Sequence, residues 1–239
     1  MKRVIFSILI FIALTFSIKA TDTLKVACVG NSVTYGAGIA ERETMSYPAQ
    51  LQQMLGGGYE VKNFGHSGAT LLKKGHNPYW KLKEFEEAVA FNPDIVIIHL
   101  GLNDTDPRNW PRYRDDFTKD YKELIDTFKA EGAEVWICRL TPIFHPHPRF
   151  KSGTRDWFWQ IQKQIERVAQ TSNVGLIDLH STLYNRPDLF PDALHPTAEG
   201  ATILAKTVYT AISKEYAGLH IAPIFSDNMV LQRNKPIVF

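Results

Sequence analysis

The chain is poor in cysteine and lacks an apolar run long enough to cross a membrane as a helix. Only two of its 239 residues are cysteines, too few for a small scaffold held together by disulfides. The longest apolar run, residues 4–18, has 15 residues, whereas a spanning helix needs about 20. With 15 glycines and 13 prolines the chain is neither collagen-like nor of low complexity. We therefore expect a globular protein that folds without a metal or a cross-link.

An excess of charge of one sign is also missing. The chain has 27 basic and 25 acidic residues. Three of the basic residues, Lys2, Arg3 and Lys19, lie in the first 20 residues, so the remainder carries 24 basic and 25 acidic side chains. A nearly neutral body gives no electrostatic basis for binding nucleic acid or an anionic membrane, and we expect neither as a partner.

Residues 1–20 have the pattern of a secretory signal peptide. Lys2 and Arg3 precede the short apolar run, and the small residue Ala20 follows it. Ile18 stands where a small residue is preferred for cleavage, so an uncleaved N-terminal anchor is the alternative. We expect a secreted or periplasmic protein without membrane contact once the signal is removed.

The two cysteines, Cys28 and Cys138, lie in apolar runs that are typical of strands. Two cysteines in an exported chain can form a disulfide. Their apolar neighbours instead favour two buried free thiols that pack as small hydrophobic side chains.

Short apolar runs alternate with helical patterns along the chain. The predicted strands are residues 24–30, 59–64, 95–100, 134–140 and 174–179. The predicted helices are residues 47–55, 81–91, 114–130, 155–169 and 198–213. Five strand–helix repeats imply an α/β fold, a three-layer α/β/α sandwich with a five-stranded parallel sheet. We expect this domain over residues 21–216, followed at 217–239 by a linker and the truncated start of a second domain.

Polar, glycine-rich clusters follow four of the five predicted strands. They occupy residues 30–34, 63–70, 101–104 and 192–196. Each cluster alone is a weak signal, since such residues occur in many loops. Ligands bind at the carboxyl ends of parallel strands, so the four clusters together predict one site.

The residue types in these clusters fit acyl transfer through a serine. Ser32 comes where a strand turns towards a helix, and a serine hydroxyl needs a base to become a nucleophile. His195 has the chemistry of that base, and Asp192, three residues earlier, can orient the imidazole. The oxyanion of the intermediate needs donors. We expect the backbone N–H groups of Ser32 and Gly68 and the side-chain amide of Asn103 to supply them.

These blocks resemble the SGNH hydrolases, also called GDSL-type esterases, over residues 24–213. Where family members carry Gly-Asp-Ser, this chain has Gly-Asn-Ser at 30–32. The family's second-block glycine falls on Gly68, its Gly-x-Asn-Asp block on 101–104, and its Asp-x-x-His-Pro block on 192–196. The resemblance implies a flavodoxin-like fold and a Ser–His–Asp esterase that needs no metal or other cofactor.

A narrower resemblance concerns the substrate. Residues 103–110 and 190–196 are similar to bacterial two-domain sialate O-acetylesterases, and residues 225–233 are similar to the start of their second domain. This implies that an acetylated glycan, with sialic acid the leading sugar, is the substrate. A lysophospholipase or thioesterase on the same fold, and a glycan-binding module without activity, are the alternatives. The polar, aromatic and basic loops favour a sugar over a long acyl chain.

Several of these residues also have a structural explanation. Ser32 could cap the helix that follows it, and Asp192 could be only a turn residue. Asp104 is expected to support the structure rather than to react. His99 lies in a buried-looking strand and is expected to be a core histidine whose hydrogen bonds are satisfied. Ser67, in Gly-His-Ser-Gly-Ala at 65–69, nearly matches the Gly-x-Ser-x-Gly nucleophile elbow, but that assignment leaves the clusters around Ser32 and Asn103 unexplained.

The stretch after the fourth predicted strand contains histidines and aromatic residues. His145 and His147 flank a proline and could bind a metal, although two ligands without a nearby carboxylate or thiol are a weak signal. Four aromatic residues in this region could line a substrate groove, or could simply pack in the interior. They are Phe144, Phe150, Trp157 and Trp159.

Overall fold

The computed structural model describes residues 23–147 and 154–213. The predictions for residues 1–20 and 217–239 concern parts of the chain outside these residues. The strands are β1 (Leu24–Gly30), β2 (Tyr59–Gly65), β3 (Ile95–His99), β4 (Glu134–Arg139) and β5 (Gly175–Asp178). They form one parallel five-stranded sheet in the order β2-β1-β3-β4-β5. The predicted strands are thus confirmed to within two residues at each end.

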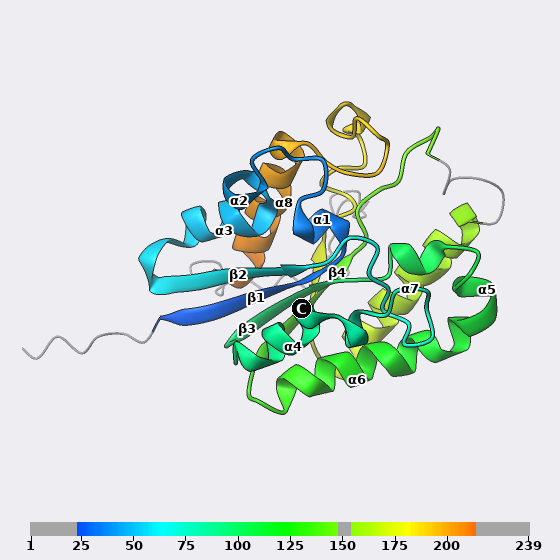
Figure 1. Cartoon of the computed structure of the whole chain (residues 1–239), viewed down its shortest axis with the longest axis horizontal. Coiled ribbons are helices and arrows are strands. Elements are labelled where there is room, and N and C mark those ends of the chain that lie inside the picture. Colours follow the sequence, from blue (N-terminus) through cyan, green and yellow to red (C-terminus); the bar gives the residue numbers. More distant parts are fainter. Residues whose placement is uncertain (1–22, 148–153, 214–239) are drawn as a thin grey trace, which may run out of the picture.

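Helices cover both faces of the sheet (Figure 1). One layer contains α2 (Arg42–Met45), α3 (Tyr47–Leu55) and α8 (Ala198–Ile212), and the other contains α4 (Lys83–Ala90), α6 (Phe117–Lys129) and α7 (Thr154–Ser172). Two further short helices, α1 (Ser32–Tyr35) and α5 (Trp110–Tyr113), lie in the loops that follow β1 and β3. The three-layer α/β/α architecture is the predicted one.

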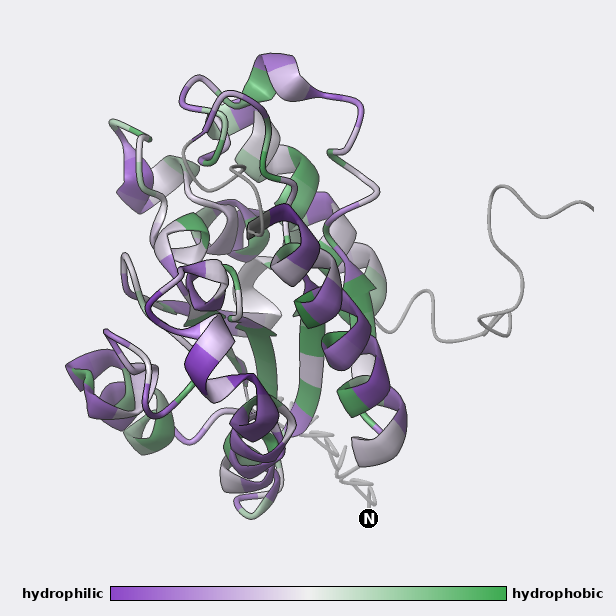
Figure 2. Ribbon diagram, turned by 90° about the vertical axis from the view of Figure 1, so that its right-hand side faces the viewer, coloured by the Kyte–Doolittle hydropathy of each residue, from purple (hydrophilic) through white to green (hydrophobic). Residues whose placement is uncertain are grey.

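The buried residues explain why these segments fold as they do. Every residue of β3 is buried, as expected for the middle strand of a sheet covered on both faces. On α6 the buried stripe includes Phe117, Tyr121, Leu124 and Phe128, at the spacing of one helix face. Figure 2 shows the apolar strands running through the middle of the molecule, with hydrophilic residues on the surrounding helices. Of the helices in the described ranges, none is long and apolar enough to span a membrane.

The register of the sheet brings three strand ends level with one another. Gly30 at the end of β1 is paired with Gly65 on one side and with His99 on the other. The two glycines leave room for α1, because a Cβ at Gly30 would overlap the side chain of Thr34, and one at Gly65 would overlap the backbone of Thr34 and Tyr35. The helix that begins with Ser32 therefore lies directly over the carboxyl ends of β1 and β2.

Both cysteines are free and buried, so the expectation of two packed thiols is confirmed. Burial raises the pKa of Cys28 to about 12, so its thiol stays protonated at neutral pH. His99 is fully buried, and burial lowers its pKa to about 4. Its Nε2 accepts a hydrogen bond from the backbone of Thr141, 3.2 Å away. His99 is therefore the neutral core histidine that was predicted, but its buried Nδ1 has no hydrogen-bond partner among the described residues, so the expectation of a fully satisfied ring is wrong.

Candidate active site

Ser32 is the first residue of α1 and lies at the end of β1. The cap of this helix is Asn31, whose side-chain oxygen accepts a hydrogen bond from the backbone of Val33 at 3.0 Å. The alternative interpretation of Ser32 as the cap is therefore wrong, and its hydroxyl is left for other partners. Asn31 occupies the position where the family carries aspartate, and its capping role was not among the predictions.

The hydroxyl of Ser32 is hydrogen-bonded to a histidine that is far away in the sequence. The Nε2 of His195 lies 2.8 Å from the Oγ of Ser32, and its Nδ1 lies 2.6 Å from Oδ2 of Asp192. When the carboxylate accepts the Nδ1 proton, Nε2 is left as an acceptor for the hydroxyl proton of Ser32. The three predicted residues thus form one hydrogen-bonded chain in the order needed for proton transfer.

Asp192 is held as a carboxylate by its own loop. Burial alone would raise its pKa, but the backbone and ring of His195 and the backbone of Leu194 donate hydrogen bonds that lower the pKa to about 2. The two backbone bonds to Oδ1 measure 2.7 Å from His195 and 3.0 Å from Leu194. One carboxylate therefore fixes both the turn and the imidazole, and its negative charge can stabilise a protonated His195.

The segment that carries Asp192 and His195 is fixed at both ends. Thr197 caps α8 immediately after it, accepting a hydrogen bond from the backbone of Gly200. On the other side, Ala193 adopts a positive φ of 63° and its carbonyl accepts a 2.8 Å bond from the backbone of Phe144. A side chain with a Cβ adopts this φ only under constraint. The loop is therefore held in one conformation by its neighbours.

The other two predicted oxyanion donors are Gly68 and Asn103, and a hydrogen bond joins the segments that carry them. The side-chain amide of Asn103, buried at the end of β3, donates a 2.9 Å hydrogen bond to the carbonyl of Ala69, the residue after Gly68. An amide nitrogen has two hydrogens, so one remains for a ligand. Gly68 has a φ of +83°, which side chains with a Cβ rarely adopt. There is room for a Cβ at this position, because its nearest neighbour would be the side chain of Asn77 at an ordinary contact distance of 3.5 Å. Within the protein, backbone conformation rather than crowding requires glycine at this position.

Three buried side chains clamp the backbone that follows Gly68, and sequence analysis identified only one of them. Asp104 accepts hydrogen bonds from the backbone of Leu71 and Leu72, at 3.0 and 2.8 Å. In the same way, Asn109 accepts one from the backbone of His76 and Asp120 accepts one from that of Lys73, both at 2.9 Å. The expectation that Asp104 has a structural role is confirmed. No local pattern pointed to Asn109 or Asp120, since their partners lie more than 30 residues away.

The buried carboxyl of Asp104 gives a testable pH effect on stability. Burial raises its pKa to about 6, against the opposing hydrogen bonds from the backbone of Leu72 and Leu71. The folded state then holds this proton more tightly than the unfolded state, so stability falls as pH rises from about 4 to about 6. We expect the free energy of unfolding of the wild type, relative to Asp104→Asn, to fall by on the order of 1–3 kcal/mol across this range. Urea unfolding at several pH values measures it.

Comparing the two proteins at each pH cancels every other group that titrates in both. If the difference in free energy of unfolding between wild type and Asp104→Asn stays constant from pH 4 to pH 7, the Asp104 carboxyl does not titrate in that range. This result would contradict the expected rise in its pKa.

The competing serine is not part of this arrangement. Ser67 is exposed, and the Nδ1 of its neighbour His66 lies 2.9 Å from Glu84. A serine at this position would also need an acid, and Asp178, which precedes His195 in the chain, accepts hydrogen bonds from Arg139 and Ser181 instead. The geometry therefore brings His195 to Ser32 and not to Ser67.

The stretch after β4 lines a cavity of its own, separate from the one beside His195. Within the described residues, no group of three or more histidine, cysteine, aspartate or glutamate side chains could hold a metal ion. Phe144 and Trp159 line a cavity at the ends of β4 and β5, not the cavity beside His195. Phe150 lies outside the described residues.

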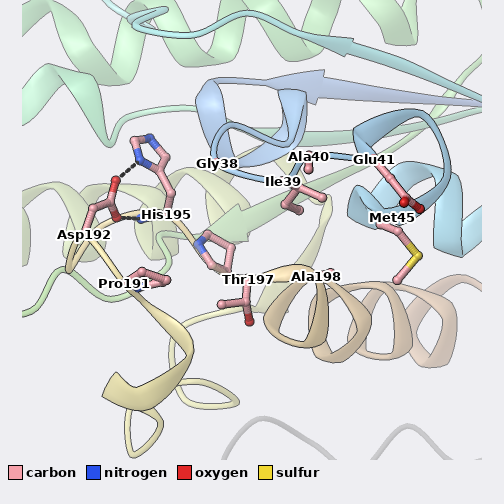
Figure 3. A pocket seen from close by; sticks show the side chains of 11 residues that line it. Gly38, Ile39, Ala40, Glu41, Met45, Pro191, Asp192, His195, Thr197 and Ala198 are labelled. Carbon is pink, nitrogen blue, oxygen red and sulfur yellow. Dashed lines mark hydrogen bonds and ion pairs between the residues drawn. The ribbon is translucent and has the colours of Figure 1, made fainter.

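A cavity of about 480 Å³ opens beside the histidine (Figure 3). Asp192 and His195 lie at one end of it, and Glu41 and Met45 lie at the other. Gly38 and Ile39, from the loop after α1, form part of the wall between them. The cavity is of the size of small-molecule sites and adjoins the hydrogen-bonded chain on the side of the histidine.

Comparisons with known proteins identify the family of the chain. The model of the GDSL-like lipase/acylhydrolase family matches residues 28–203. An acetylxylan esterase of Xylanibacter ruminicola is 36% identical over 212 residues, covering 80% of this chain and 43% of that protein. The chain therefore spans less than half the length of this relative.

Solved structures share the fold at lower sequence identity. A crystal structure of an acetyl xylan esterase superposes with a TM-score of 0.62 at 21% identity, covering 80% of this chain and all of that one. An aryl esterase of M. smegmatis superposes with a TM-score of 0.64 at 21% identity, covering 79% of this chain and all of that one. These likenesses establish the fold of the sheet and its helices.

Proposed function

Since the chain belongs to the GDSL-like lipase/acylhydrolase family, we propose that it is a serine esterase that removes O-acetyl groups from a carbohydrate. The observation that carries the proposal is the hydrogen-bonded chain of Ser32, His195 and Asp192, with distances of 2.8 and 2.6 Å. A capping serine or a turn aspartate needs no such partner. The same three residues can hydrolyse other acyl esters, so they do not identify the substrate class.

In the proposed mechanism Ser32 attacks the acetyl carbonyl while Nε2 of His195 takes its proton. His195 then returns the proton to the sugar hydroxyl as the ester bond breaks, which leaves an acetyl group on Ser32. A water molecule, deprotonated by the same nitrogen, attacks the acetyl-enzyme. His195 then returns this proton to the oxygen of Ser32 as the acyl bond breaks and acetate is released. Asp192 remains ionised throughout and stabilises the imidazolium.

The negative charge on the carbonyl oxygen needs donors that are in place before the reaction. We assign this role to the backbone N–H groups of Ser32 and Gly68 and the amide of Asn103. The clamp formed by Asp104, Asn109 and Asp120 supports the assignment, because it fixes the segment after Gly68 relative to Asn103 and requires no reorganisation when charge develops.

The substrate class is inferred from the relative that shares most of this chain. An acetylxylan esterase at 36% identity favours an acetylated carbohydrate, and xylan in particular. The motifs around Asn103 and His195 that resemble sialate O-acetylesterases favour O-acetylated sialic acid. Both substrates present an acetyl ester on a sugar hydroxyl to the same three residues.

Hydrolysis of a substrate panel tests the proposal. Acetylated xylan, O-acetylated sialic acid, a lysophospholipid and nitrophenyl acetate would be compared by kcat/KM. We expect turnover of an acetylated sugar and of nitrophenyl acetate, and little turnover of the lysophospholipid. Preference for the long acyl chain would replace this proposal with that of a lysophospholipase.

We expect kcat/KM to rise as the pH is raised through the neutral range. Only the neutral ring of His195 can accept the proton of Ser32. Asp192, with a pKa of about 2, stays charged over this range and adds no second step. Initial rates on nitrophenyl acetate, corrected for spontaneous hydrolysis, measure the profile. A rate that is flat or falls with rising pH would contradict a role for His195 as the base.

A further inference from the structure

Two exposed aromatic side chains gather at one cavity, apart from the cavity beside His195. Among the described residues, three large hydrophobic side chains are exposed: Trp159 by 38%, Leu176 by 38% and Tyr184 by 55%. Trp159 and Tyr184 both line a cavity of about 390 Å³ at the ends of β4 and β5. Single exposed apolar residues are common, but exposed aromatic residues that share a cavity mark a binding surface.

The aromatic rings of this cavity are arranged around a histidine. The ring of His180 lies 5.2 Å from that of Trp159 at 75°, and 5.4 Å from that of Tyr184 at 41°. Its Nδ1 lies 3.2 Å from the carbonyl of Leu140, so in the neutral ring Nδ1 donates and Nε2 is an acceptor. Flat apolar rings beside a fixed hydrogen-bond acceptor suit a pyranose, which has one face of C–H groups and a rim of hydroxyls.

The polar groups of the cavity include one guanidinium, that of Arg155, and no carboxylate. Arg155, His145 and Asn185 line it together with His180, and none of its lining residues is acidic. The cavity beside His195 differs, because Glu41 and Asp192 line it. No residue in the described part of the chain forms an ion pair with Arg155, whereas Arg139, Arg186 and Arg108 are each paired with a carboxylate. An available guanidinium is suited to bind a carboxylate with two parallel hydrogen bonds.

This cavity shares a wall with the loop that carries the proposed catalytic residues. Phe144, which lines it, donates its backbone hydrogen bond to Ala193, between Asp192 and His195. The ring of Phe144 also packs against Phe190, with centroids 5.0 Å apart. One connection, from β5 to α8, therefore supplies Tyr184 to the aromatic cavity and His195 to Ser32.

We propose that the aromatic cavity binds an acidic sugar residue, a pyranose that carries a carboxylate. Trp159 and Tyr184 contact the apolar face of the ring, and Arg155 binds the carboxylate. Uronic acids and sialic acids share this chemistry. That the sugar belongs to the same glycan as the acetyl ester rests on the proposed function, whereas its binding to the cavity does not.

Binding is tested on the full chain with Ser32→Ala, so that no turnover occurs. Isothermal titration would compare a xylo-oligosaccharide with one glucuronic acid branch, the unbranched oligosaccharide of the same length, and N-acetylneuraminic acid. We expect at least one acidic ligand to bind about 10-fold or more tightly than the neutral one. A hydrogen-bonded pair of charged groups, here Arg155 and the sugar carboxylate, contributes a free energy of this size. The ligand that binds identifies whether the source is a uronic or a sialic acid.

The role of Arg155 is tested with a matched control on the same helix. In the Ser32→Ala background we expect Arg155→Gln to abolish the preference for the acidic ligand. Arg167→Gln removes the same charge about 18 Å further along α7 and should leave the preference intact. Trp159→Ala should weaken binding of the acidic sugar, and Trp159→Phe should restore part of it. Circular dichroism and unfolding midpoints verify that each variant is folded.

The inference would be overturned if neutral and acidic ligands bound with equal affinity. It would also be overturned if Arg155→Gln and Arg167→Gln lowered the affinity for the acidic ligand by the same factor. Failure of the proposed function gives a different result. Wild-type protein would then hydrolyse no acetylated sugar, while the Ser32→Ala protein would still bind the acidic sugar through Arg155.

Discussion

Replacing Ser32 by alanine is expected to lower kcat for acetyl esters by at least about 10⁴-fold, the scale of losing a serine nucleophile. Alanine removes only the hydroxyl that lies 2.8 Å from Nε2 of His195. Among the described residues the hydroxyl that is hydrogen-bonded to Nε2 of His195 is that of Ser32, so we expect the residual rate to reflect substrate binding and the oxyanion donors. Initial rates on nitrophenyl acetate and on the best sugar ester measure the loss, and circular dichroism shows that the fold is kept.

Ser67→Ala is the matched control for this prediction. It makes the same chemical change at the serine of the near-match to a nucleophile elbow, on an exposed loop. We expect a substantial part of the activity to remain. If the two results were exchanged, Ser67 would be the nucleophile and the assignment of Ser32 would be wrong.

Asn103→Ala is expected to lower kcat by on the order of 10²–10³, with KM nearly constant. In the proposed mechanism the amide donates one hydrogen bond to the oxygen that becomes negative, and this charge is absent from the bound substrate and develops on the way to the tetrahedral intermediate. The variant also loses the hydrogen bond to the carbonyl of Ala69, at a cost of about 1 kcal/mol in stability. Steady-state kinetics on nitrophenyl acetate, together with urea unfolding, separate the two effects.

Labelling by an organophosphate provides an independent control for Asn103→Ala. Ser32 and His195 are unchanged in this variant, so slow covalent labelling should persist. A higher KM with an unchanged kcat would instead make Asn103 a substrate-binding residue, and its assignment as an oxyanion donor would have to be withdrawn.

Much of the fold could be predicted because its signals are local. The stripe of Phe117, Tyr121, Leu124 and Phe128 identifies α6 from its spacing alone, and all four side chains are buried. The prediction for this region began at residue 114, whereas α6 begins at Phe117 after a 3-10 turn at Arg114–Asp116. The first and last residues of a helix depend on a few hydrogen bonds at its ends, which the spacing of apolar residues does not determine.

The short helices near the site could not be predicted in the same way. A four-residue helix such as α1 or α5 has too few residues to show a period. Its existence depends on the cap at Asn31 or on packing of Trp110, which is fully buried. The cap at Asn31 is a local hydrogen bond from the backbone of Val33, whereas the burial of Trp110 is a tertiary effect that overrides a weak local preference.

The residues that could act chemically were easier to find than the residues that hold them. Ser32, Asp192 and His195 lie in recognisable blocks, and a parallel sheet brings strand ends together. The clamp residues Asn109 and Asp120 bind backbone groups of a distant segment, so neither a motif nor a spacing marks them. The aromatic residues near Phe144 were noted in the sequence, but only the structure separates their cavity from the one beside His195.

If Ser32 carries the acetyl group during turnover, the acetyl-enzyme can be trapped on this residue. Nitrophenyl acetate would be mixed with the protein and quenched in acid within the first turnover, and the peptides would be analysed by mass spectrometry. We expect a peptide containing Ser32 that is heavier by one acetyl group, and no such adduct in the Ser32→Ala protein. An acetyl group on the peptide containing Ser67, or active enzyme with no acetylated serine at any quench time, would contradict the assignment of Ser32 as the nucleophile.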